Sequence, residues 1–213
     1  MLAILMLLPL SVLTLLSEYL WRKKLLRGEG GRKFVHILSG VWISAWPYFV
    51  GYRTIQLLSI ALLLIALASR FLHVFRVVRD VKRRTLGDLL FPLAVLTCAS
   101  LTPATWVFTT AMLYLALADG LAAVVGTRYK KVAHYYQVFG QKKSVLGTLT
   151  YFVTALVILF VSTSLLSPES SFVLGGSLTS LLSVVVVATL LENLSPYGSD
   201  NLSIPLFIVI ALR

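Results

Sequence analysis

The sequence predicts an all-α fold, a polytopic integral membrane bundle of about seven or eight transmembrane helices in a single domain over residues 1–213. Hydrophobic residues make up 58% of the chain, against about 45–50% in a typical soluble domain, and the mean hydropathy is +0.91. Several apolar runs approach the roughly 20 residues that cross a bilayer as a helix. Basic residues gather in alternate loops between these runs, which is typical of a membrane topology.

The first apolar run differs from a signal peptide, in which positive charges precede the apolar core. Here the charges follow the core, as WRKKLLR in residues 21–27, so we expect a first helix that is retained. The last run is short for a span and contains Pro205, which favours a broken or partly inserted helix. The apolar runs predict helices over residues 2–20, 34–50, 54–72, 86–101, 106–125, 145–166, 172–191 and 201–213.

Charge alternates from loop to loop along the chain. The first, third and fifth loops are strongly basic, whereas the even-numbered loops carry little charge. This pattern predicts that the N-terminus lies outside and that the basic loops are cytoplasmic. It also accounts for the net charge of +11 without nucleic acid, so no nucleic-acid partner is expected. The basic loop residues are Arg22, Lys23, Lys24, Arg27, Arg32, Lys33, Arg76, Arg79, Lys82, Arg83, Arg84, Arg128, Lys130, Lys131, Lys142 and Lys143.

The acidic residues fall into two groups. Ionisable groups at the membrane margin are rare unless they pair, bind ions or act on a substrate. Four acids at or just inside helix ends on the predicted cytoplasmic side therefore predict a functional site, although each one alone is equally well explained as a cap or an ion pair. These four are Asp88, Asp119, Glu192 and Asp200. The others are interpreted as ordinary solvated or interfacial charges: Glu18, Glu29, Asp80 and Glu169.

The fifth loop has the composition of an anion site. Backbone N–H groups at a helix start bind phosphate together with lysines, and Mg²⁺ binds through carboxylates plus substrate phosphates. We therefore expect Asp119 to bind metal or nucleotide. The alternative is that the lysine pair is only a topology signal. The loop residues concerned are Gly126, Gly140, Lys142, Lys143, Ser144 and Gly147.

A second basic element stands at the predicted mouth of the second helix. Arg32, Lys33 and His36 lie in GRKFVHILSG, and Arg32 and His36 share a helix face because four residues separate them. This spacing favours a phosphate or substrate contact, with topology as the alternative for the two basic residues. The sequence contains no Walker A loop, dinucleotide fingerprint or nucleophile elbow, and its single Cys98 forms no Cys-rich metal site.

Four elements follow one another over about residues 30–210. They are RKFVH, LGDLLFPL, a central Asp-x-x-Ala with a spaced glycine and Lys-Ser-x-x-Gly, and ENLSPYGSDNLSIP. Together they resemble the membrane family of CTP-dependent lipid-alcohol kinases, which comprises dolichol kinase, phytol kinase and the fungal-type diacylglycerol kinase. These enzymes are related to the CTP:phosphatidate cytidylyltransferases. One departure is Leu146, where the family often has glutamate.

The resemblance implies transfer of the γ-phosphoryl group of CTP to a long isoprenoid alcohol of the dolichol, polyprenol or phytol type, with Mg²⁺ as cofactor. It implies catalytic roles for Asp88, Asp119 and Asp200, with Asp88 or Asp200 accepting the alcohol proton. The implied metal ligands are Asp119, Glu192 and Asp200. The implied nucleotide-binding residues are Gly120, Gly126, Lys142, Lys143, Ser144 and Gly147. The implied substrate or phosphate contacts are Arg32, Lys33, His36 and Asn201.

Three alternatives remain at this point. A CTP:phosphatidate cytidylyltransferase would use the same nucleotide and a similar lysine-rich loop, and a diacylglycerol kinase would use a different lipid. A membrane transporter or scaffold would be no enzyme at all. A transporter is expected to place charge near the bilayer midplane, whereas the conspicuous acids are predicted at one margin.

Overall fold

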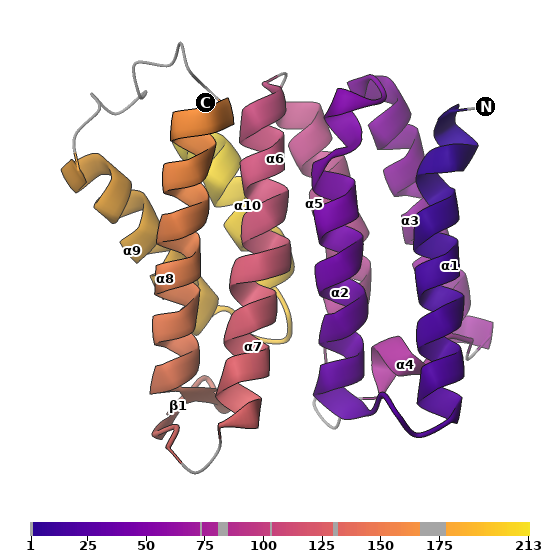
Figure 1. Cartoon of the computed structure of the whole chain (residues 1–213), viewed down its shortest axis with the longest axis horizontal. Coiled ribbons are helices and arrows are strands. Elements are labelled where there is room, and N and C mark those ends of the chain that lie inside the picture. The colour runs from indigo at the N-terminus through magenta and orange to yellow at the C-terminus, as the bar shows by residue number, and fades with distance from the viewer. Residues whose placement is uncertain (1, 73, 81–84, 103, 130–131, 167–177) are drawn as a thin grey trace.

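Apolar helices stand side by side in the computed structural model of this chain (Figure 1). It describes residues 2–72, 74–80, 85–102, 104–129, 132–166 and 178–213. The helices are α1 (Leu2–Arg22), α2 (Gly28–Ser44), α3 (Tyr52–Leu72), α4 (Arg76–Arg79), α5 (Gly87–Leu101), α6 (Thr105–Leu113), α7 (Asp119–Arg128), α8 (Val145–Val161), α9 (Leu178–Leu194) and α10 (Asp200–Ala211). A 3₁₀ turn (Trp46–Tyr48), two π-helical turns (Tyr114–Ala118 and Ser162–Leu166) and strands β1 (Tyr135–Val138) and β2 (Gln141–Ser144) complete the described elements.

The predicted membrane bundle is confirmed, and most predicted helices match within a few residues. Four helical stretches in the described part of the chain are long and apolar enough to cross a membrane: Ala3–Arg22, Tyr52–Leu72, Thr105–Arg128 and Val145–Leu166. Helices α5, α9 and α10 are apolar but shorter. Residues 172–177 of one predicted helix lie outside the described residues, as do Lys82, Arg83, Arg84, Lys130, Lys131 and Glu169.

Helix α2 begins six residues earlier than predicted. The sequence GEGG reads as a loop because glycine is a poor helix former, yet it forms the first turn of α2. Tertiary packing explains this start, since a Cβ atom at Gly31 would lie 3.2 Å from the side chain of Val77 in α4. The helix ends at Ser44, shortly before Pro47, whose ring disfavours helical geometry at the preceding residue.

The stretch Thr105–Arg128 is the most buried of the four long ones. Helices α2, α8 and α10 pack around it, and Phe108, Met112 and Tyr114 are completely buried there. A π-helical turn over Tyr114–Ala118 interrupts its α-helical geometry immediately before Asp119. Such turns are rare and frequently occur at functional sites.

A β-hairpin that was not predicted precedes α8. Strands β1 and β2 pair antiparallel, with Val138 opposite Gln141. The two turn residues Phe139 and Gly140 both have positive φ angles, +47° and +74°, which is the geometry of a type I′ hairpin turn. The hairpin, α4 and the first turn of α2 all lie at one end of the bundle, opposite the N-terminus (Figure 1).

Two acids at this end stabilise the connections between helices. Glu18 was interpreted as an ordinary solvated or interfacial charge, but it is not solvated: the residue is buried and accepts a hydrogen bond of 3.1 Å from the backbone N–H of Val77. Asp80 accepts hydrogen bonds from the indole of Trp21 at 2.8 Å and from the backbone of Gly28 at 2.9 Å. These contacts hold α4 against the ends of α1 and α2.

Candidate active site

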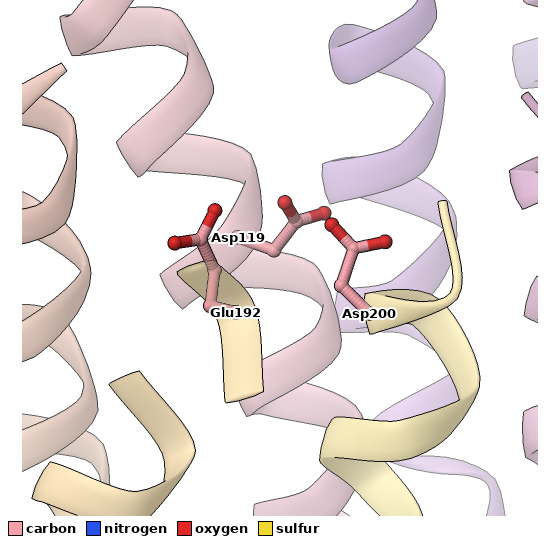
Figure 2. Close-up of side chains that lie close together, drawn as sticks. All are labelled: Asp119, Glu192 and Asp200. Carbon is pink, nitrogen blue, oxygen red and sulfur yellow. The ribbon is translucent and has the colours of Figure 1, made fainter. Parts of the chain in front are cut away.

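Three of the four predicted acids meet in one cluster. Asp119 begins α7, Glu192 lies in the last turn of α9, and Asp200 begins α10. Carboxylate oxygens of all three lie within 4.8 Å of one another, and all three residues are buried. Figure 2 shows the three side chains side by side, each on a different helix. We call these residues the acidic cluster.

Two lysines compensate the charge of the acidic cluster. The Nζ atom of Lys33 lies 2.5 Å from Asp119 Oδ2, and both side chains are almost completely buried. The Nζ atom of Lys143 lies 2.5 Å from Glu192 Oε1 and 2.8 Å from the backbone oxygen of Glu192. Because a buried charge is costly unless it is paired, these contacts explain how three carboxylates stay together inside the bundle.

His36 forms a further contact with the cluster. Its Nε2 atom lies 3.3 Å from Asp119 Oδ2 and 2.8 Å from the backbone oxygen of Leu115. The ring packs edge-on against Phe91, with 5.0 Å between the ring centroids. His36 thus lies between the acidic cluster and helix α5.

Asp119 lies deeper than the helix end at which it was predicted, whereas Glu192 and Asp200 lie at helix ends as expected. Asp119 precedes the end of its helix at Arg128 by nine residues, which at 1.5 Å per residue is about 13 Å. The expectation that all the acids lie at one margin, which speaks against a transporter, therefore does not hold for Asp119. The predicted helix ended at residue 125, three residues before its end at Arg128.

A cavity of about 400 Å³ opens beside the acidic cluster. We call it the acidic pocket. It brings together all three acids, the lysines Lys33, Lys142 and Lys143, and the start of α8. Its lining residues are Glu29, Lys33, Asp119, Ala122, Ala123, Gly126, Thr127, Tyr135, Gly140, Gln141, Lys142, Lys143, Ser144, Gly147, Thr148, Glu192 and Asp200.

The predicted helix start at Ser144 is present, but its N–H groups are partly used. Ser144 caps α8, and its Oγ atom accepts a hydrogen bond of 3.0 Å from Gly147 N. The N–H of Val145 donates to the backbone oxygen of His134 at 2.8 Å. An anion at this helix start would therefore depend more on the lysines than on these two amides.

The predicted glycines act mainly in helix packing. A Cβ atom at Gly126 would lie 2.6 Å from Ser144 Oγ, and one at Gly147 would lie 3.1 Å from the backbone oxygen of Ala122. Both glycines line the acidic pocket, and they let α7 and α8 approach closely. Gly120 does not line it: a Cβ atom there would lie 2.2 Å from the side chain of Ile37, so this glycine permits the contact between α7 and α2.

Asp88 does not join the acidic cluster. Its two carboxylate oxygens accept hydrogen bonds from Arg70 at 2.5 and 2.8 Å. Asn201 is buried and donates to the backbone oxygen of Gly87 at 2.9 Å, so it links the start of α10, beside Asp200, to the start of α5, beside Asp88. The fourth predicted acid is thus a neighbour of the site and not part of its cluster.

Asp88 lines a second, larger cavity of about 810 Å³, which we call the apolar chamber. Arg32 and His36 also line it, whereas Lys33 lines the acidic pocket, so α2 separates the two cavities. The lining residues are Leu10, Thr14, Arg32, Val35, His36, Ser39, Ile43, Leu62, Ile65, Ala66, Ser69, Arg70, Phe75, Val78, Thr85, Leu86, Gly87, Asp88, Phe91, Pro92 and Tyr197.

Several site residues were missed at the level of sequence. Glu29 was interpreted as an ordinary charge, yet it pairs with Arg32 at 2.5 Å and lines the acidic pocket. Tyr135 lines the same pocket, and the ammonium of Lys142 lies 4.1 Å from its ring centroid. The signal that could have found the hairpin is the run Tyr-Tyr-Gln-Val, which is rich in strand-forming residues and precedes a turn that contains glycine.

These observations define a class: a polytopic helical membrane protein in which buried carboxylates and lysines adjoin a large apolar cavity. Comparison with curated proteins identifies the family within that class. The chain is 33% identical over 205 residues to the phytol kinase of Synechocystis sp., an alignment that covers 92% of this chain and 84% of the relative. The chain therefore belongs to the lipid-alcohol kinase family. No protein-family model and no solved structure matches it.

Proposed function

We propose that this protein transfers the γ-phosphoryl group of CTP to the hydroxyl group of an isoprenoid alcohol, at the end of the bundle that carries the basic loops. The observation that carries the proposal is the acidic cluster between Lys33 and Lys143, one helix away from the apolar chamber. The similarity to a phytol kinase supports a lipid alcohol as acceptor. CTP as donor and the cytoplasmic side of the reaction rest on the sequence elements and the charge alternation.

The donor site would be the acidic pocket. Three buried carboxylates within 4.8 Å of one another fit Mg²⁺, which takes oxygen ligands and is commonly held by one or two carboxylates plus substrate phosphates. Asp119, Glu192 and Asp200 would hold the ion, and its positive charge would stabilise the negative charge that develops during transfer.

Lys33 and Lys143 would change partners when nucleotide binds. Each ammonium now pairs with a carboxylate of the acidic cluster. Once those carboxylates held a divalent cation, Lys33 and Lys143 would give up these ion pairs and pair with the phosphates in the same pocket. The lysines would then orient the β- and γ-phosphates, together with Lys142 at the rim.

The reaction needs few covalent steps from the protein. The alcohol oxygen forms a bond to the γ-phosphorus, the bond from that phosphorus to the β,γ-bridging oxygen breaks, and CDP leaves. The hydroxyl proton passes to a carboxylate: Asp88 lines the apolar chamber and Asp200 lines the acidic pocket. The pH dependence of kcat/KM in Asp88→Asn and Asp200→Asn decides between them, since loss of the base removes the corresponding acidic limb.

The test uses purified protein in detergent micelles with Mg²⁺, CTP labelled on the γ-phosphate, and a panel of phytol, polyprenols, dolichol and diacylglycerol. We expect label to move into the organic phase with an isoprenoid alcohol, and unlabelled ATP should compete poorly. Formation of a CDP-lipid from phosphatidate and α-labelled CTP, without γ-label transfer, would replace the proposal by cytidylyl transfer. If Asp119→Asn and Asp200→Asn both kept wild-type rates, the site assignment would be refuted.

A further inference from the structure

The apolar chamber has one polar end and one apolar end. Arg32, Gly87 and Asp88 lie at the end that adjoins the basic loops, whereas Leu10, Ile43 and Leu62 lie deeper in the bundle. Along α2 the lining extends from Arg32 to Ile43, a rise of about 16 Å at 1.5 Å per residue. The hydrocarbon core of a bilayer is about 30 Å thick, so the lining along α2 is about half as long as the membrane is thick.

The polar end lies next to the acidic cluster. His36 lines the chamber, and its Nε2 atom is 3.3 Å from Asp119 Oδ2, so the width of a single side chain separates the two. Arg32 is buried and also lines the chamber. It pairs with Glu29 through Nη2, while its Nε atom has no hydrogen-bond partner among the described residues. A buried donor of this kind is costly unless a ligand satisfies it.

The chamber reaches the surface of the bundle both at its polar end and beside α3. At the polar end, Leu86 and Tyr197 line the chamber and are 47% and 56% exposed. Ile65 of α3 also lines the chamber and is 49% exposed. The cavity therefore reaches the outer surface of the bundle beside α3, where an apolar molecule can enter from the bilayer.

We propose that the apolar chamber binds the isoprenoid chain of the acceptor, with the hydroxyl group between Arg32 and His36 and the chain running along α2 toward Leu62. This inference rests on the proposed function. It adds where the lipid binds, how its chain is oriented and where it enters the protein. A volume of about 810 Å³ lies within the roughly 300–1,000 Å³ of small-molecule sites. One chain with one polar end suits it better than a lipid with two acyl chains.

The kinetic test compares two alanines on α3 that point to different sides of the helix. Ala66 lines the chamber, whereas Ala68, two positions further on, is exposed and does not line it. Ala66→Trp fills the cavity and should raise the KM for phytol at least about 10-fold, while the KM for CTP stays within about twofold. Ala68→Trp is the matched control and should leave both values near those of the wild type. Equal effects of the two variants on the lipid KM would overturn the proposal.

Chain length gives a second kinetic readout. In the wild type the KM should fall as the isoprenoid chain lengthens up to about 16 Å and change little beyond it, because longer chains leave the chamber. A KM independent of length from the shortest alcohol onward would contradict binding of the chain in the chamber.

Photolabelling decides the proposal independently of turnover. A phytol analogue with a diazirine in its chain is irradiated with the purified protein, and labelled peptides are mapped by mass spectrometry. Label on α1, α3 and α5 that disappears in Ala66→Trp would support the chamber, and label on α8 and α9 would overturn it. If the wild type transfers no phosphate to any alcohol, the proposed function fails, but the labelling result still decides where the lipid binds.

Discussion

Replacing Asp119 with asparagine tests whether the acidic cluster is built for a divalent cation. The 2.5 Å contact between Lys33 and Asp119 corresponds to an attraction of about 7 kcal/mol at an effective dielectric constant of about 20. The oxygens of Glu192 and Asp200 lie within 4.8 Å, and each repels Asp119 by at least about 3 kcal/mol on the same scale. Attraction and repulsion nearly cancel, so removing this charge should cost little when no divalent cation is bound.

We therefore expect Asp119→Asn to change the free energy of unfolding by less than about 2 kcal/mol in EDTA. Mg²⁺ at about 100 times its Kd should stabilise the wild type by about 2.7 kcal/mol, and Asp119→Asn should lose most of this gain. Thermal unfolding in detergent, measured in EDTA and along a Mg²⁺ titration, gives both values. Asp88→Asn is the matched control, since Asp88 pairs with Arg70 outside the cluster, and it should keep the wild-type response.

Two results would refute this reasoning. The first is a full Mg²⁺-dependent rise in Tm in Asp119→Asn. The second is a loss of about 3–5 kcal/mol in EDTA, the cost of leaving a buried partner such as Lys33 uncompensated. Either result would make the cluster a structural ion-pair network and not a cation site.

Three further predictions concern residues around the site. Lys143→Ala should lower kcat/KM for the nucleotide about 100-fold, measured by label transfer, with Lys143→Arg retaining more activity because it keeps the charge; equal rates in both would exclude a role for the charge. Gly126→Ala should lower the free energy of unfolding by about 1–3 kcal/mol, since the new Cβ atom would lie 2.6 Å from Ser144 Oγ. Gly30→Ala, where nothing lies within 4 Å, should not destabilise, and similar losses in both would contradict the packing argument. The backbone N–H of Gly28 and the indole of Trp21 hold the pKa of Asp80 below its usual value of 3.8. A lowered pKa in the folded state means that Asp80 stabilises the fold above about pH 3.8 and that this contribution is lost as the pH falls through the folded pKa. The difference in Tm between wild type and Asp80→Asn should therefore shrink in acid, and a difference independent of pH would disprove the contribution.

Local signals in the sequence predicted the framework of this protein. Apolar runs predicted helices such as α3 and α5 almost to the residue, because burial in lipid requires a continuous apolar stretch. Ser144 was expected at a helix start and caps α8, since capping depends on neighbours three residues away. The hairpin before α8 was predictable in the same way but was interpreted as a loop.

Local signals of this kind do not predict contacts between residues that are far apart in the sequence. Lys33 and Asp119 are separated by 86 positions, and no pattern in either segment indicates that they touch. The start of α2 at Gly28 depends on packing against α4 and not on the helix propensity of GEGG. The burial of Glu18 also depends on a distant segment, since the backbone N–H of Val77, 59 positions away, donates a hydrogen bond to its carboxylate.

The sequence by itself thus determined the class of fold, the alternation of basic loops and a set of four suspect acids, since each of these is written in composition or in spacing along one segment. The tertiary structure alone decided which acids act together. Asp119, inside a long helical stretch, meets Glu192 near the end of α9 and Asp200 at the start of α10, whereas Asp88 pairs with Arg70 at the apolar chamber. The physical reason is that a cluster of like charges is stable only where neighbouring elements supply compensating lysines, here Lys33 from α2 and Lys143 from β2. That supply depends on packing in three dimensions.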